Sequence, residues 1–367
     1  VESTVVSALA VKALRDHLVT VHVDHGFMRE NESRRVTEEL RSIGLDPILV
    51  DASEEFFDGL RGVEKGDEKR RIVGNLFIKT FERLAEEKSV TALVQGTIAP
   101  DAIESSRGIA SKGKGSSHGG MIKLHHNVGG LPQDMWIDVL EPVRDLFKYQ
   151  VRILGEALGV PDSLLYRQPF PGPGLSVRVG GMVDRVKVGV IRGITSEVEN
   201  FLKPYEPAQY LAYLIDLEVR REPRAEEIAG DFLGRDYEIE ADVHEVVAVG
   251  VKGDERVLGK VLSLDILLNG EPAWQTIRWL DILRMQSAIT GRLRDVCRVV
   301  ATIGRYDHGE MGVVVRAVDT RDFMTAMPTQ VPFDRLGSLG EKIVEHPMVS
   351  RAYYEITTKP SSTIELE

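Results

Sequence analysis

The sequence is short of several residue types, and each shortage excludes a class of protein. It has one cysteine, Cys297, which excludes an internal disulfide framework and any metal site built from several cysteines. No apolar run approaches the roughly 20 residues of a membrane-spanning helix, so no membrane span is expected. Basic residues are too few for a general nucleic-acid surface, because 46 lysines and arginines face 57 aspartates and glutamates, for a net charge of −11.

Two further absences concern the compartment and the start of the chain. No secretory signal sequence is visible, which together with the single cysteine makes the cytoplasm the expected location. The chain begins with Val1 instead of methionine, already inside an amphipathic helical pattern, so we expect the native N-terminus to lie further upstream. The flanks of Cys297, RLRDVCRVV, predict a buried small residue and not a nucleophile.

The first part of the chain has the alternating pattern of an α/β fold, and the length of 367 residues predicts two or three domains. Short apolar strands are expected within 18–26, 46–52 and 91–97. Amphipathic helices lie between them, including a long one over about 68–87. This order predicts a mostly parallel sheet with helices on both faces, a fold that binds ligands beyond the carboxyl ends of its strands.

A loop that alternates proline with glycine, QPFPGPGLSVRVGG at 168–181, separates the two parts of the chain. Such a composition excludes a helix interior or a central strand and fixes the backbone shape. A rigid linker would satisfy the same pattern. We interpret the segment as a loop that shapes a ligand site, with a domain boundary near residue 178.

The second part of the chain predicts an α+β unit that is duplicated. EPAQYLAYLIDL from Glu206 is echoed by EPAWQTIRWLDIL from Glu271, and a strand–turn–strand pattern from Val246 is echoed from Val299. Each copy is expected to contain a helical segment and two strands, giving units at about 185–268 and 269–367. Chance similarity of short hairpins is the alternative, and the sequence leaves both open.

Three stretches are candidates for chemistry. After the strand at 91–97, a glycine- and serine-rich stretch connects two carboxylates to a lysine and two histidines, namely Asp101, Glu104, Lys123, His125 and His126. Lysines neutralise phosphate and histidines donate hydrogen bonds or move protons, so this pattern predicts a lid over a polyanion. An inert solvated loop is the alternative, and zinc is disfavoured because adjacent histidines point apart in a strand.

The other two candidates lie at the ends of the chain. Ser3 and Thr4 open a helix, where free backbone N–H groups bind anions, although capping the helix is the alternative role. The last stretch, SRAYYEITTKPSSTIELE, contains β-branched residues and a proline corner. We expect this tail to dock on the rest of the protein instead of fraying.

Taken together, these stretches resemble the GMP synthetase family, in its ATP-pyrophosphatase domain and the following dimerisation domain, which binds xanthosine monophosphate. The matching stretches stand in the family's order: VDHGFMRENE, EKRRIVGNLF, QGTIAPDAIES, IKLHHNVGGLP, EPVRDLFKYQVR, YRQPFPGPGLSVRV, VRAVDTRDFMTA and YEITTKPSSTIELE. The resemblance implies an adenine nucleotide alpha hydrolase-like α/β domain over 1–178, a dimerisation domain over 179–367, and hence a homodimer. It also implies that ATP and Mg²⁺ serve to adenylate O2 of xanthosine monophosphate, with release of pyrophosphate, before ammonia displaces AMP and forms GMP.

The resemblance assigns residue roles, motif by motif. The positions that match catalytic residues are Asp101, Glu104, Lys123, His125 and His126. Those that match ATP contacts are Ser3, Val23, Gly96 and Thr97, and Glu2 matches a magnesium ligand. Those that match contacts to xanthosine monophosphate are Arg70, Gln209 or its echo Gln275, Arg351, Lys359, Ile364 and Glu365.

The sequence also departs from the family pattern. Glu2 stands where the family has aspartate, and the Ser-Gly-Gly that precedes that aspartate is not in the chain, so the chain as given is expected to bind ATP poorly. Leu124 replaces a small hydroxyl residue, and Ser361 and Ser362 replace a proline and a small residue. A glutaminase domain is also missing, so a glutamine amidotransferase domain or subunit is the expected source of ammonia. Another ATP-pyrophosphatase-type amidating enzyme, or a nucleotide-binding dimer that has lost adenylation, are the alternatives.

Overall fold

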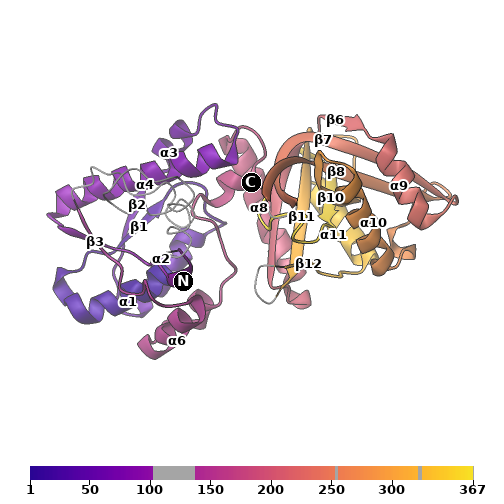
Figure 1. Ribbon diagram of the computed structural model, residues 1–367. Helices are drawn as coiled ribbons and strands as arrows, with labels where there is room; N and C mark the ends of the chain where they lie inside the picture. The colour runs from indigo at the N-terminus through magenta and orange to yellow at the C-terminus, as the bar shows by residue number, and fades with distance from the viewer. Residues whose placement is uncertain (102–136, 253–254, 321–324, 367) are drawn as a thin grey trace, which may run out of the picture. The chain divides into compact units, whose positions relative to one another are not determined.

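The computed structural model describes residues 1–101, 137–252, 255–320 and 325–366, and the chain divides into two compact units, Val1–Gly174 and Leu175–Glu367 (Figure 1). Four residues with predicted catalytic roles, Glu104, Lys123, His125 and His126, lie outside the described residues. Within the described part of the chain, every helix is too short or too polar to cross a bilayer.

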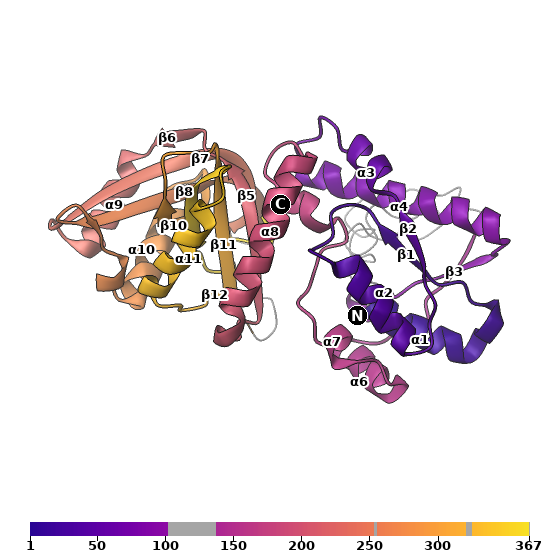
Figure 2. The ribbon, with the colours of Figure 1, turned by 180° about the vertical axis from the view of Figure 1, so that it is seen from behind.

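The first unit is an α/β fold whose described strands pair in parallel. Strand β1 (Val21–Asp24) pairs with β2 (Ile48–Asp51), and β3 (Ala92–Val94) pairs with β4 (Asp138–Leu140). Its described helices are α1 (Glu2–Leu14), α2 (Glu32–Ser42), α3 (Ser53–Gly59), α4 (Gly66–Lys88), α6 (Lys148–Leu158) and α7 (Asp162–Leu165). Figures 1 and 2 show α3 and α4 on one side of β1 and β2, with α1 and α2 on the other side. The predicted parallel sheet with helices on both faces is confirmed.

The core of this unit forms where the apolar face of α1 meets α6 and α7. Val5 of α1 is fully buried, as are Val151 of α6 and Leu165 of α7. Burial of each such side chain contributes roughly 1.5–3 kcal/mol relative to exposure. Gly155 allows the close approach, because a Cβ there would lie 2.4 Å from the Leu165 side chain. The packing therefore fixes the start of α1 relative to α6.

The second unit is an α+β fold built on a nine-stranded mixed sheet. Its main path runs β12 (Met327–Pro328), β11 (Met311–Asp319), β13 (Val349–Glu355), β10 (Val296–Arg305), β8 (Glu255–Leu268), β7 (Tyr237–Lys252) and β6 (Val219–Arg221). Strand β5 (Gln209–Asp216) pairs with β11, and β9 (Glu271–Pro272) pairs with β8. The helices are α8 (Arg185–Leu202), α9 (Pro223–Leu233), α10 (Trp279–Arg292) and α11 (Phe333–Val344).

The two echoing segments of this unit take different structures. The helix expected from Glu206 is wrong, because this segment forms β5, whereas its echo from Glu271 leads into helix α10. Antiparallel pairing of β5 with β11 over eight residues, most of them buried on both faces, outweighs the local helical pattern. The strand–turn–strand echoes differ as well, since β7 and β8 pair directly while β13 lies between β10 and β11.

Candidate functional site

The start of α1 lies against the segment that follows β3. A Cβ on Gly96 would stand 2.8 Å from the backbone nitrogen of Ser3 and 2.9 Å from the carbonyl carbon of Glu2, so this approach requires glycine. Thr97 is the next residue, and its hydroxyl lies 3.5 Å from Oε1 of Gln95. The structure therefore brings together Glu2, Ser3 and Gly96 at one helix N-terminus. The capping alternative for Ser3 is wrong, because Val1 occupies the N-cap position.

A lysine lies near the carboxylate of Glu2. Lys148 Nζ, from the first residue of α6, lies 3.5 Å from Glu2 Oε1. The N–H groups of the first turn of α1 add partial positive charge at the same place. The arrangement offers a polyanion backbone donors and a lysine, together with one carboxylate. Lys148 was not among the predicted site residues.

Asp101 and Val23 make the following contacts within the first unit. Asp101 accepts a hydrogen bond from the backbone nitrogen of Ile98 at 3.2 Å and so fixes the turn that ends the segment after β3. Val23 is buried in β1, with 7 % of its surface exposed, and pairs with Val50 of β2. A side chain in that position has little surface left for a ligand.

The proline–glycine loop is anchored on the connection between β1 and α2. A Cβ on Gly174 would lie 2.3 Å from the carbonyl oxygen of Phe27, so the two backbones are in direct contact. Arg29 donates to the carbonyl of Gln168 at 3.1 Å, and its guanidinium stacks 4.5 Å from the centroid of the Phe170 ring. The shape of this loop is thus fixed by contacts with Phe27 and Arg29, which follow β1.

A buried histidine completes this anchor. His25 is 2 % exposed, its Nδ1 accepts from the backbone nitrogen of Phe27 at 3.0 Å, and its ring contacts Phe56 and Phe77. Burial lowers the pKa of His25 to about 4, and hydrogen bonding to the backbone of Gly172 opposes that shift. The imidazole is therefore neutral near pH 7 and acts as a structural group.

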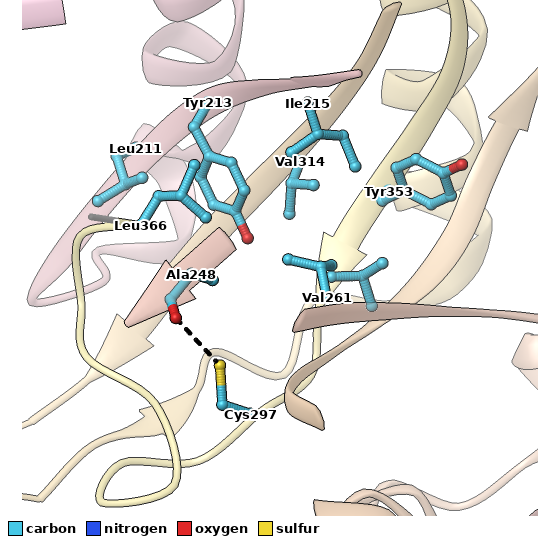
Figure 3. Packing of buried hydrophobic residues seen from close by; sticks show 10 residues of the cluster. Leu211, Tyr213, Ile215, Ala248, Val261, Cys297, Val314, Tyr353 and Leu366 are labelled. Atoms are coloured by element: carbon cyan, nitrogen blue, oxygen red, sulfur yellow. Dashed lines mark hydrogen bonds between the residues drawn. The ribbon is translucent and has the colours of Figure 1, made fainter. Parts of the chain in front are cut away.

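The C-terminal tail docks on the second unit, as predicted. The backbone nitrogen of Val249 donates to the carbonyl of Leu366 at 2.8 Å, and that of Val251 donates to the carbonyl of Ser361 at 3.1 Å. Leu366 is fully buried, and Figure 3 shows it beside Leu211 and Tyr213. The same view shows Cys297, which is also fully buried with its sulfur 3.6 Å from the carbonyl of Ala248, so its predicted burial is confirmed.

The predicted nucleotide contacts of the tail all have partners within the second unit. Glu365 accepts a bidentate pair of hydrogen bonds from Arg178, at 3.0 and 3.2 Å, and is 20 % exposed. Lys359 pairs through its backbone with Ala326, and Ile364 packs against the buried apolar cluster. Arg351 Nη1 donates to two backbone carbonyls, those of residues 306 and 350.

The remaining predicted contacts are more scattered. Gln209 is buried at the start of β5, and Gln275 is exposed and donates to the carbonyl of Pro272. Arg70 lies on α4 of the first unit. A cavity at the ends of β5 and β11, lined by Asp184, Lys187, Asp216 and Glu310 among others, includes none of the predicted site residues.

A buried charge network centred on Glu355 contacts the last residues of the chain through its two arginines. Glu355 is fully buried and accepts from both Arg298, at 3.0 Å, and Arg316, and it also accepts from the hydroxyl of Tyr213 at 2.8 Å. Burial, followed by the nearby carboxylate, raises the pKa of Tyr213 well above its ordinary value, so the hydroxyl remains a donor. Sequence reasoning missed these residues, together with Arg178. For Arg298 and Arg316 the signal was an arginine within an otherwise apolar strand, which requires a buried partner.

A parallel α/β unit with a glycine-bounded helix N-terminus at its strand ends, followed by an α+β unit, is typical of an enzyme that binds nucleotides. Comparison with known proteins gives the family. Residues 304–366 match the family model described as "GMP synthase C terminal domain". The chain is 38 % identical over 376 residues to a protein of Methanopyrus kandleri that is named as one of the subunits of "GMP synthase [glutamine-hydrolyzing]", covering all of this chain and 90 % of that protein.

Other relatives agree. The protein of the same name from Archaeoglobus fulgidus is 36 % identical over 369 residues, with the same coverage. "GMP synthase [glutamine-hydrolyzing]" of Aeropyrum pernix is 36 % identical over 368 residues, which span all of this chain and 56 % of that relative. The chain belongs to the GMP synthase family, whose members are ligases that form carbon–nitrogen bonds, and the predicted family is confirmed.

Proposed function

We propose that this protein makes GMP from xanthosine monophosphate, ATP and ammonia. ATP adenylates O2 of the xanthine base and pyrophosphate leaves, then ammonia displaces AMP to give GMP. The observation that carries the proposal is the docked tail with Glu365 held by Arg178, within the segment that matches the family's C-terminal domain. A thiolating or NAD-forming relative of the same α/β fold has no need of such a tail.

The first unit is the proposed site of adenylation. The N–H groups at the start of α1, with Ser3, Gly96 and Thr97, would meet the phosphates of ATP, and Val23 would contact ATP through its backbone. Lys148 would add a positive charge at the same place, 3.5 Å from Glu2. The proposed catalytic residues are Asp101, Glu104, Lys123, His125 and His126, in a basic lid that neutralises phosphate and keeps water from the adenylated intermediate.

Magnesium is proposed to join ATP at this site. In the stretches that the structure covers, no three His, Cys, Asp or Glu side chains are grouped to hold a metal. Glu2 still fits, because Mg²⁺ usually takes one or two carboxylates and completes its shell with substrate phosphates and water. When bound, the ion would neutralise phosphate charge. Lys148, which lies near Glu2, would add positive charge for a polyphosphate.

The second unit is the proposed site for xanthosine monophosphate. Arg351 and Lys359 would meet its phosphate, whereas Ile364 and Glu365 would meet the base, with Gln209 as a further contact. Arg70 lies on the first unit and stays a predicted phosphate contact. We also propose a homodimer formed through this unit. Ammonia would come from a glutamine amidotransferase partner, in keeping with relatives that are named as one subunit of a glutamine-hydrolysing enzyme. Because ATP and purine nucleotides are cytoplasmic metabolites, we expect the enzyme in the cytoplasm.

Pyrophosphate release from ATP by the full-length protein tests the proposal, with and without xanthosine monophosphate and ammonium. We expect release only with xanthosine monophosphate, and GMP only when ammonium is added. Glu365→Gln should reduce the stimulation of pyrophosphate release by xanthosine monophosphate. Glu345→Gln, at an exposed position on the same unit, should behave as wild type. Binding of xanthosine monophosphate without any pyrophosphate release would instead support the nucleotide-binding dimer that has lost adenylation.

A further inference from the structure

Three arginines outside the tail contact successive parts of it. Arg178 donates two hydrogen bonds to the carboxylate of Glu365. Arg298 donates to the hydroxyl of Thr363 at 2.8 Å and to the carbonyl of Glu365. Arg316 donates to the hydroxyl of Ser362 at 2.9 Å. The tail is therefore held at three of its last six residues by guanidinium groups from the body of the unit.

These arginines have little freedom to move. Arg178 is 2 % exposed, and Arg298 and Arg316 are fully buried. Arg298 and Arg316 share Glu355, which has no exposed surface, so leaving their positions would leave a buried charge unpaired. A network of this kind favours one arrangement of its members. The tail that it contacts is correspondingly fixed.

We propose that Arg178, Arg298 and Arg316 are positioning residues for the nucleotide site, and that they act by holding the tail in its binding geometry. The inference rests on the proposed function, in which the tail contacts xanthosine monophosphate. The fork of Arg178 holds both oxygens of the Glu365 carboxylate, which is 20 % exposed, and so fixes its orientation. In the proposed function, that oriented carboxylate faces the xanthine base.

The inference predicts a specific effect of Arg178→Lys in the full-length protein. Lysine keeps the charge but cannot form the bidentate pair, so the dissociation constant and KM for xanthosine monophosphate should rise by about tenfold or more. The kcat at saturating xanthosine monophosphate should change by less than about threefold, because bound substrate restores the geometry. Arg292→Lys is the matched control, since its ion pair with Asp231 is exposed, and it should leave both constants unchanged.

Thr363→Ala and Thr363→Ser provide a second test that leaves Arg298, Arg316 and Glu355 unchanged in sequence. Alanine removes the acceptor of Arg298 and the hydrogen bonds to Val249 and Glu365, whereas serine keeps the hydroxyl. We expect weaker nucleotide binding and faster amide hydrogen exchange over residues 357–366 in the alanine variant, and recovery of both in the serine variant.

Nucleotide binding by the wild type tests the proposed function, and the variants test the positioning role. If the wild-type protein does not bind xanthosine monophosphate, the proposed function fails and the inference fails with it. If the wild type binds it, but folded Arg178→Lys and Thr363→Ala keep wild-type affinity and tail exchange, only the positioning role is overturned.

Discussion

Replacing Glu355 by glutamine removes the one carboxylate shared by two buried arginines. Arg298 and Arg316 each pair with it, all three side chains are at most 1 % exposed, and the Tyr213 hydroxyl also donates to it. Removing one partner of a buried pair costs about 3–5 kcal/mol, because the remaining charge stays desolvated without compensation. Two cations remain here, so we expect the free energy of unfolding to fall by about 4–5 kcal/mol.

Urea unfolding followed by tryptophan fluorescence measures this change in the right part of the molecule. Trp274 and Trp279, two of the three tryptophans, lie in the second unit and stack on Phe333 with ring centroids 5.2 and 5.3 Å apart. The control is Glu245→Gln, which breaks an exposed ion pair with Lys260 and should leave the unfolding midpoint near that of wild type.

A small loss of stability would refute the reasoning. If Glu355→Gln costs less than about 1 kcal/mol, water must reach the arginines and the network is not a dry one. A matched replacement separates charge from packing. Simultaneous Arg298→Met, Glu355→Leu and Arg316→Met removes all three charges and should cost much less than the single change, since no buried charge is left unpaired.

Three further predictions concern other sites. Burial lowers the pKa of His25 to about 4, against 6.5 in the unfolded chain, so the unfolded state binds a proton first as the pH falls. The free energy of unfolding should therefore fall by about 3 kcal/mol between pH 6.5 and pH 4 and show no effect of His25 above pH 6.5. Measurements of the free energy of unfolding against pH should show this slope, and a smaller slope in His25→Gln. Gly96→Ala should raise the KM for ATP at least about tenfold by displacing Ser3, whereas Gly189→Ala, which meets nothing within 4 Å, should not; equal KM values would contradict the proposed ATP site. Cys297 should react with a thiol reagent only after urea unfolding, and prompt labelling of the native protein would contradict its burial.

The strands and helices of the first unit could be predicted from the sequence, for a physical reason. Its strands β1, β2 and β3 fall within the short apolar runs at 18–26, 46–52 and 91–97, and α4 spans the long amphipathic stretch. Hydrophobic periodicity is enough to predict these elements, because parallel strands and crossover helices alternate along the chain. The segment from Glu206 shows where periodicity fails, since its strand structure depends on β11, about a hundred residues later.

The residues of the candidate sites also differ in how far the sequence alone could predict them. Glu2, Ser3 and Gly96 come from motifs that can be read locally, and the structure does bring them together. Arg298 and Arg316 also carried a local signal, because each interrupts an apolar strand, and a buried cation requires a counter-charge. The sequence could not identify that counter-charge, since Glu355 is nearly forty residues or more from either arginine and only the placement of β13 between β10 and β11 joins them. Residues that would touch the nucleotide are thus visible in motifs, whereas the residues that hold the tail become visible only when the order of the strands is known.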